Sequence, residues 1–119
     1  GGTELTKADK EDCILIICKF MKAYTTGELD SLKEHVDWKR LGATFEEAKK
    51  RFKQLKGDPR LEQMKGNEEN LARHIFRYIF KNGLCYVRVP TDQTFSAWRT
   101  LVVLAKINGR LKIIQFRTW

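Results

Sequence analysis

Residues 95–119 read FSAWRTLVVLAKINGRLKIIQFRTW, and this stretch decides the fold. Asn108-Gly109 lies between two runs that are rich in β-branched and aromatic residues. An Asn-Gly pair between such runs favours a type I′ turn, because both central residues of that turn take a positive φ. The sequence therefore predicts a β-hairpin, with one strand over Phe95–Ile107 and the return strand over Arg110–Trp119.

The two-residue turn also predicts the register of this hairpin, in which Ile107 faces Arg110. In that register one face is apolar along Leu101, Val103, Ala105, Ile107, Ile114 and Phe116. The second face carries Trp98, Val102, Leu104, Leu111, Ile113 and Trp119, interrupted by Thr100, Gln115 and Arg117. Because both faces are substantially apolar, one should pack on helices, and the other needs a cover: another helix, a partner subunit or a ligand in a cavity.

The chain before the hairpin has mainly helical periodicity. Thr6 and Thr44 open capping-box motifs, which favour helix starts, whereas Gly27 and Asn82-Gly83 favour helix ends. We predict helices over approximately residues 6–24, 28–36, 44–56 and 67–82, and a further strand over residues 84–89.

Length and composition agree with one globular domain spanning residues 1–119. Apolar residues make up 42% of the chain and charged residues 32%, which is typical of a folded protein and not of a disordered one. Helices first and strands last predict an α+β domain, in which N-terminal helices pack on a C-terminal antiparallel sheet of three or more strands.

Residues 17–32, ICKFMKAYTTGELDSL, predict an apolar helix that leads through Gly27 into a second helix, and residues 108–114 are the turn and the start of the return strand of the final hairpin. Together they resemble the start and end of the nuclear-transport-factor-like superfamily, a cystatin-like α+β group, and in particular its small secreted bacterial members. The resemblance implies a curved antiparallel sheet wrapped around helices as a cone with a pocket. It also implies a homodimer, since many members of the group pair through the sheet.

The chain departs from that group in two respects. Residues 41–80 are more helical than is usual, and three strands can be counted where more are typical. The steroid isomerases of the group place a tyrosine where the spacing back from Gly27 gives Phe20 in this chain. A phenyl ring cannot donate a hydrogen bond to an oxyanion, so isomerase chemistry of that kind is not expected.

Candidate ligand-binding residues are polar and aromatic side chains that a cone or the second hairpin face would gather: Tyr24, His74, Tyr86, Trp98, Arg99, Arg117 and Trp119. In the predicted register Trp98 and Trp119 pair across the strands, and Arg99 and Arg117 lie near them. An arginine beside an indole can hold a small anionic or aromatic ligand. The alternative, which we favour, is a sheet edge kept soluble by its charges.

Signals for catalysis, metals or cofactors are weak. His74 lies on the apolar stripe of the fourth predicted helix, which is more typical of a core histidine than of a catalyst. A nucleophilic pair with Cys85 stays a minor alternative. His35 lies near Glu34 and Asp37, but the spacing fits surface charge better than a metal site. The sequence has no Gly-rich phosphate loop and no zinc or calcium spacing, so no cofactor or metal is expected.

The net charge of +8 and the pI near 9.6 permit attraction to nucleic acid, an anionic membrane or acidic proteins. The densest basic run is Lys49, Lys50, Arg51, Lys53 and Lys56. It lacks the interleaved aromatic residues on which single-strand binders stack bases, so a solvated helix face is favoured.

The three cysteines, Cys13, Cys18 and Cys85, fit small buried apolar side chains. Cys13 and Cys18 point in different directions on one helix and cannot bridge each other, whereas Cys85 could pair with either. No apolar run is long enough to span a bilayer. A secreted or periplasmic location, with a signal peptide already removed, stays open.

Three function classes remain from the sequence. A non-enzymatic ligand-binding or protein-interaction domain, homodimeric through its sheet, is favoured because no catalytic constellation stands out. The first alternative is a small-molecule enzyme of the same fold with a polar pocket. The second is a basic nucleic-acid-binding domain.

Overall fold

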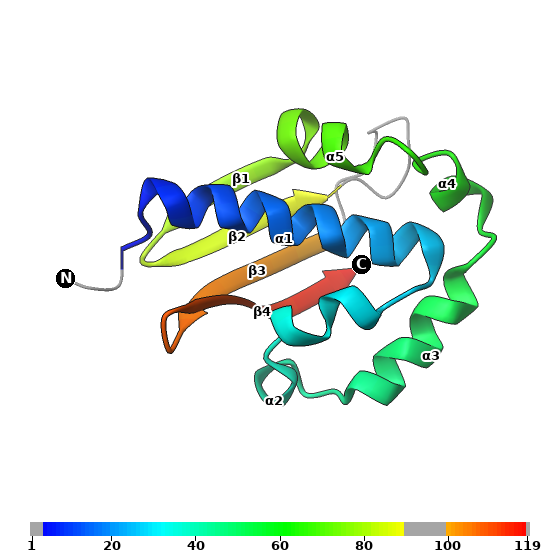
Figure 1. Cartoon of the computed structure of the whole chain (residues 1–119), viewed down its shortest axis with the longest axis horizontal. Coiled ribbons are helices and arrows are strands. Elements are labelled where there is room, and N and C mark those ends of the chain that lie inside the picture. The colour runs from blue at the N-terminus through cyan, green and yellow to red at the C-terminus, as the bar shows by residue number, and fades with distance from the viewer. Residues whose placement is uncertain (1–3, 90–99, 119) are drawn as a thin grey trace.

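The computed structural model of the chain describes residues 4–89 and 100–118. Helical segments come first and a curved four-stranded antiparallel sheet comes last, which confirms the predicted α+β class (Figure 1). The helical segments are α1 (Lys7–Thr26), η1 (Asp30–His35), α2 (Trp38–Leu41), α3 (Phe45–Leu55), α4 (Pro59–Glu62), α5 (Glu68–Asn70) and η2 (Leu71–Ile75). The strands are β1 (Arg77–Lys81), β2 (Leu84–Val89), β3 (Thr100–Ile107) and β4 (Arg110–Thr118), in the order β1-β2-β3-β4.

The long helix α1 has the predicted start and end. The Thr6 hydroxyl accepts a hydrogen bond from the Asp9 backbone N–H at 3.1 Å, and the Asp9 carboxylate accepts one from the Thr6 N–H at 2.9 Å. Gly27 ends the helix with a φ of 76° and donates its N–H to the Ala23 carbonyl. The helix crosses in front of the sheet (Figure 1). Its apolar residues Cys13, Ile16, Ile17, Cys18, Phe20, Met21 and Ala23 are buried, whereas Leu15 is exposed.

The final hairpin forms with the predicted turn. Asn108 and Gly109 have φ values of 52° and 79°, and Ile107 pairs with Arg110. The two hairpin strands are described from Thr100 to Ile107 and from Arg110 to Thr118, so the predicted strand residues 95–99 and 119 lie outside the described part.

The register of this hairpin departs from the prediction at one place. Leu104 pairs with Ile113, but Val103 pairs with Gln115, so Ile114 is an extra residue in β4, a β-bulge. The extra residue reverses the facing of every later side chain. Phe116 therefore lies on the helix side of the sheet and Gln115 on the other side, which corrects the predicted faces.

The fourth predicted helix is wrong beyond Ile75. Residues 77–81 form strand β1, and Asn82-Gly83 is a second tight turn, with φ values of 55° and 75°, that joins β1 to β2. In β1 partly buried Tyr78 and Phe80 alternate with exposed neighbours, so the residues follow a strand period once they pair with β2. Tertiary pairing overrides the local helical spacing, and the sheet gains a fourth strand.

The two faces of the sheet have different neighbours. The face toward α1 carries the buried side chains Cys85, Val87, Val89, Thr100, Val102, Leu104, Leu111 and Ile113. We call the opposite side the outer face. Among the described residues, the helical segments all lie on the α1 side, so none of them supplies the cover that the sequence predicts for a second apolar face (Figure 1).

Candidate functional site

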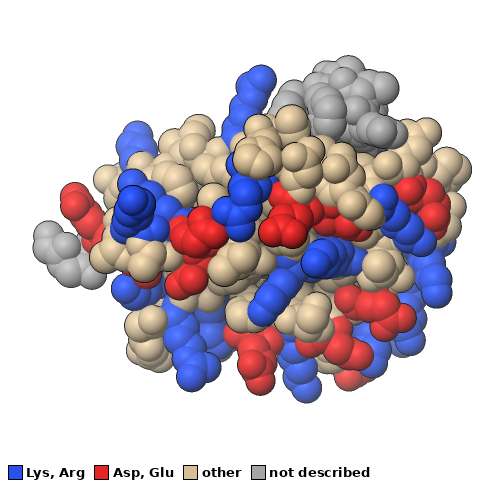
Figure 2. All heavy atoms as spheres, turned by 45° about the horizontal axis from the view of Figure 1, so that its top comes forward, with Lys and Arg blue, Asp and Glu red and all other residues tan. Residues whose placement is uncertain are grey.

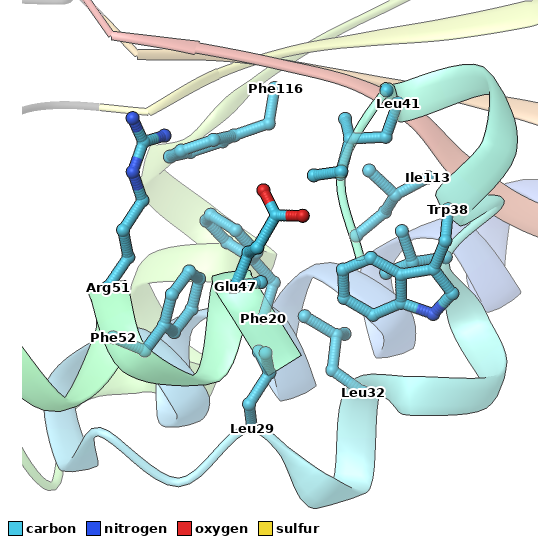
Figure 3. Close-up of a pocket in the computed structure, with 14 residues that line it drawn as sticks. Phe20, Leu29, Leu32, Trp38, Leu41, Glu47, Arg51, Phe52, Ile113 and Phe116 are labelled. Carbon is cyan, nitrogen blue, oxygen red and sulfur yellow. The ribbon is translucent and has the colours of Figure 1, made fainter. Parts of the chain in front are cut away.

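An open cavity lies between η1, α2, α3 and strand β4, and we call it the η1–α3 cavity (Figure 3). Its volume is about 340 Å³. Most of its walls are apolar, from Phe20, Leu29, Leu32, Val36, Trp38, Leu41, Gly42, Ala43, Ala48, Phe52, Ile113 and Phe116. Its two charged lining residues are Glu47 and Arg51, one helical turn apart on α3.

The wall formed by η1 and α2 is fastened to the edge of the sheet. Val36 forms a parallel bridge with Ile113, and the Asp37 N–H donates to the Ile113 carbonyl at 2.9 Å. The Asp37 carboxylate caps α2 by accepting from the Arg40 N–H at 3.2 Å. The Trp38 indole N–H donates to the carbonyl of Lys33 at 3.0 Å, which fixes the ring at the cavity wall. These contacts join η1 and α2 to each other and to strand β4.

An aromatic cluster forms the floor of the cavity. The Phe20 ring lies 5.3 Å from the Phe116 ring and 6.2 Å from the Phe52 ring, measured between centroids. Tyr24 stacks on Phe20 at 5.8 Å, and burial raises the pKa of its phenol. Aromatic rings at these separations gain a favourable pair interaction in addition to the free energy of burying their surfaces. The floor is therefore a well-packed apolar surface.

A second aromatic pair stands at the opposite wall. Trp38 and Phe45 meet edge to face at 5.6 Å. The ammonium groups of Lys33 and Lys49 lie 5.0 Å and 5.7 Å from the centroid of the Phe45 ring, within the range of cation–π attraction. These contacts hold the side of the cavity that α3 shares with η1.

The two charged groups of the cavity differ in their partners. The Glu47 carboxylate accepts from the Thr44 hydroxyl at 3.1 Å, and Figure 3 shows it extending into the cavity. The Arg51 guanidinium extends from α3 toward Phe116 in the same view. No described residue forms a hydrogen bond or ion pair with it. The guanidinium has five N–H donors and lies beside the aromatic floor, so it can donate hydrogen bonds to an acceptor group of a ligand.

Of the ligand-binding residues that the sequence predicts, the four that the structure describes do not lie together at one place. Tyr24 lies in the aromatic cluster on the helix side, whereas Tyr86 and Arg117 lie on the outer face with β3 between them. His74 is exposed in η2, so the prediction of a core histidine is wrong: the apolar stripe of the predicted helix is broken where η2 gives way to β1. Trp98, Arg99 and Trp119 lie outside the described residues.

The side chains considered for nucleophilic or metal chemistry have other roles. Cys85 is buried in the core, where a hydrogen bond with Cys13 and burial raise the pKa of its thiol, which disfavours a reactive thiolate. The ring Nε2 of His35 lies 3.2 Å from the Lys19 ammonium, and burial together with that charge lowers the pKa of His35. Within residues 4–89 and 100–118, no group of histidine, cysteine and acidic side chains could hold a metal ion.

The chain matches no protein-family model, no curated protein and no solved structure. None of the helices in the described part of the chain is long and apolar enough to cross a membrane.

Sequence reasoning missed the two charged residues of the cavity. Glu47 was visible as the third residue of the Thr44 capping box, and Arg51 as part of the basic run on the following helix. Both positions precede, by one residue, members of the apolar stripe at Ala48 and Phe52. That adjacency places them at the border of the buried face, which is the signal that could have found them.

Proposed function

We propose that this chain is a non-enzymatic binding domain, and that its η1–α3 cavity holds a small ligand with an apolar or aromatic body and an anionic group. The observation that carries the proposal is a largely apolar cavity with an unpaired arginine at its wall. Ligand pockets in proteins combine these two features: apolar walls supply affinity and a few polar groups supply orientation.

The size of the cavity supports a ligand of one or two rings. Its volume of about 340 Å³ lies at the lower end of the range for small-molecule pockets. The aromatic floor of Phe20, Phe52 and Phe116 offers ring faces and edges to an aromatic body. This arrangement also fits the cone with a pocket that the resemblance to the nuclear-transport-factor-like superfamily implies.

The charges at the wall support an anionic group over a cationic one. Glu47 already accepts a hydrogen bond from Thr44, so its carboxylate has a partner within its own helix start. Arg51 is the group whose donors are open, and a carboxylate, sulfonate or phosphate matches the fork of a guanidinium. The enzyme alternative would rest on Glu47 as a base, with no second catalytic group among the described lining residues.

Anilinonaphthalene sulfonate is a suitable probe, because it joins aromatic rings to an anionic group and becomes fluorescent in apolar sites. We expect saturable, single-site binding to the folded protein. Replacing Arg51 with Met should weaken binding about tenfold or more, because a charge-assisted hydrogen bond contributes about 1.5–3 kcal/mol. Ala48→Phe should abolish binding by filling the cavity. Lys50→Met is the matched control, since it removes an equal charge from an exposed neighbour on α3.

The test requires that each variant unfolds cooperatively, because the dye also binds loosely packed states. Equal weakening by Arg51→Met and Lys50→Met would mean that net charge, and not the cavity, holds the dye. Unchanged binding in Ala48→Phe would place the dye elsewhere. Either result contradicts the proposal.

A further inference from the structure

Strand β1 lies at one end of the strand order and forms a rim of the sheet (Figure 1). The tight turn at residues 82–83 makes Lys81 and Leu84 a hydrogen-bonded pair, and such pairs alternate along the two strands. The backbone N–H and C=O groups of Tyr78 and Phe80 therefore point away from β2. No residue in the described part of the chain bonds to these four groups. The rim can therefore accept a further strand.

An open groove of about 580 Å³, which we call the β1 groove, runs between this rim and the first turns of α1. It is lined by Lys7, Ala8, Lys10, Glu11, Ile14, Tyr78 and Phe80. The rings of Tyr78 and Phe80 are stacked, with centroids 6.3 Å apart, and Ile14 is half-buried. A strand added to β1 would place every second side chain on the same side as these two rings, and therefore in the groove.

Three lysines gather where β1 meets its turn. The Lys10 ammonium lies 5.1 Å from the centroid of the Phe80 ring, and Lys7 lines the groove about one helical turn earlier on α1. Lys81 is exposed at the end of β1. Within residues 4–89 and 100–118, no carboxylate forms an ion pair with any of these three ammonium groups. This end of the groove can therefore attract an anionic group.

The acidic residue that lines the groove already has a partner. The Glu11 carboxylate pairs with the Arg73 guanidinium at 2.9 Å, so it does not neutralise the three lysines. Figure 2 turns the upper side of Figure 1, where β1 lies, toward the viewer, and uncharged surface lies there between blue side chains. The rim thus combines open backbone groups, apolar surface and positive charge.

The charge of the rim favours an acidic partner over a second copy of the chain. A lysine on an edge strand, such as Lys81, is a common means by which sheets avoid pairing with their own copies. A second copy would bring the same lysines to the rim, whereas an acidic segment brings complementary charge.

We propose that the rim of β1 binds an extended acidic segment of another protein as an added strand. The backbone of the segment pairs with Tyr78 and Phe80, its apolar side chains enter the β1 groove, and its acidic side chains meet the lysines. In strand addition, main-chain hydrogen bonds supply affinity, and pockets for alternate side chains supply specificity. The η1–α3 cavity lies at β4, the opposite edge of the sheet, so the two sites are separate.

A fluorescein-labelled peptide of about seven residues, in which glutamate and valine alternate, tests the proposal by fluorescence anisotropy. We expect saturable binding at a single site. A peptide with serine in place of valine keeps the charge but puts no apolar group in the groove, so it should bind at least about tenfold more weakly. A peptide with lysine in place of glutamate should also bind at least about tenfold more weakly, because its charges repel the rim.

N-methylated peptides test the backbone pairing directly. In an added strand, one set of alternate N–H groups bonds to β1 and the other set faces solvent. Methylating the nitrogens of either the valines or the glutamates removes one set of donors and keeps every side chain. One of the two peptides should bind at least about tenfold more weakly, and the other should change by less than about threefold.

The double variant Lys10→Gln, Lys81→Gln tests the charges of the rim. It should weaken binding about three- to tenfold at about 0.05 M salt, and by less at about 0.5 M salt. The matched control is Lys50→Gln, Lys53→Gln on exposed α3, which removes the same charge and should change binding by less than about twofold. Urea unfolding shows whether each variant is folded, and the peptide series needs only the unaltered protein.

Three outcomes would overturn the proposal. Equal binding of the glutamate–valine and glutamate–serine peptides would show attraction by net charge alone. Equal effects of the two N-methylated peptides would exclude strand addition. A dimer that Ile79→Lys dissociates, in a protein that binds none of the peptides, would assign the rim to a second copy.

Discussion

Replacing Phe116 with Ala tests the position of the bulge in β4. The ring contacts Phe20 at a centroid distance of 5.3 Å and Tyr24 at 6.5 Å, and it is packed against the core from the cavity floor. Truncating a fully buried phenylalanine costs about 3–5 kcal/mol. Because one side of Phe116 faces the open cavity, we expect roughly half of that, plus part of the aromatic pair energy of about 0.5–1.5 kcal/mol. The expected loss is about 2–3 kcal/mol.

Gln115→Ala is the matched control, because Gln115 is the neighbouring residue and lies on the outer face. Its replacement should change the free energy of unfolding by less than about 0.5 kcal/mol. Urea unfolding followed by circular dichroism measures both values. A double-mutant cycle between Phe20 and Phe116 should give a coupling of about 0.5–1.5 kcal/mol.

A simple hairpin register would give the opposite pattern, because Phe116 would then lie outside and Gln115 inside. A loss below about 1 kcal/mol for Phe116→Ala, with no coupling to Phe20, would refute the bulge and the aromatic floor together.

Three further outcomes are expected. Gly27→Ala should destabilise the protein by about 1–2 kcal/mol, and by more than Gly42→Ala. Both glycines have a positive φ, but of the two only Gly27 would place a new Cβ 3.2 Å from the Phe52 carbonyl oxygen. Equal losses of stability in the two variants would contradict this. All three cysteine thiols are buried, so their modification by a disulfide reagent should follow unfolding, and a thiol that reacts within seconds in the native protein would disagree. His35 has a lowered pKa, so its contribution to stability should be lost as the pH falls from about 6.5 through the pKa of the folded state. His35→Gln should flatten that decline in the free energy of unfolding. An NMR titration of the His35 ring should give a pKa below that of a free histidine.

Local chemistry predicted the segments in which one physical effect dominates. The capping box at Thr6 and the N-cap at Thr44 start helices, because the threonine hydroxyls accept hydrogen bonds from backbone N–H groups in the first helical turn. The Asn108-Gly109 turn forms because Asn and Gly tolerate a positive φ.

The wrong prediction concerns residues 67–82, whose local sequence fits a helix and a strand almost equally well. Leu71, Ile75, Tyr78 and Ile79 have helical spacing, yet the helical conformation ends at Ile75 and the strand begins at Arg77. The deciding energy comes from pairing with β2, which joins residues through a turn that is itself Asn-Gly. Asn82-Gly83 is therefore the turn between two short strands and not a helix end, just as Asn108-Gly109 is the turn of the final hairpin.

The candidate site was less predictable than the fold, because cavities form between segments that lie far apart in the sequence. Arg51 on α3 and Phe116 on β4 line the same cavity, and the wall formed by η1 and α2 is bonded to Ile113 of β4. Residue types alone favoured the tryptophans and arginines of the hairpin. The periodicity of a single helix or strand does not predict which of its side chains will line a cavity that forms between four separate elements.

The bulge at Ile114 explains how one strand serves both surfaces of the sheet. The sequence of β4 alternates as far as Ile113, breaks with a second isoleucine, and alternates again through Gln115, Phe116 and Arg117. Without the extra residue, Gln115 and Arg117 would point into the helical core and Phe116 would point outward. With it, the apolar ring completes the cavity floor and the two polar side chains join the basic outer face. The mixed face of the simple register was thus a sign of the irregularity, since a buried charge without a partner is costlier than one unpaired ladder position.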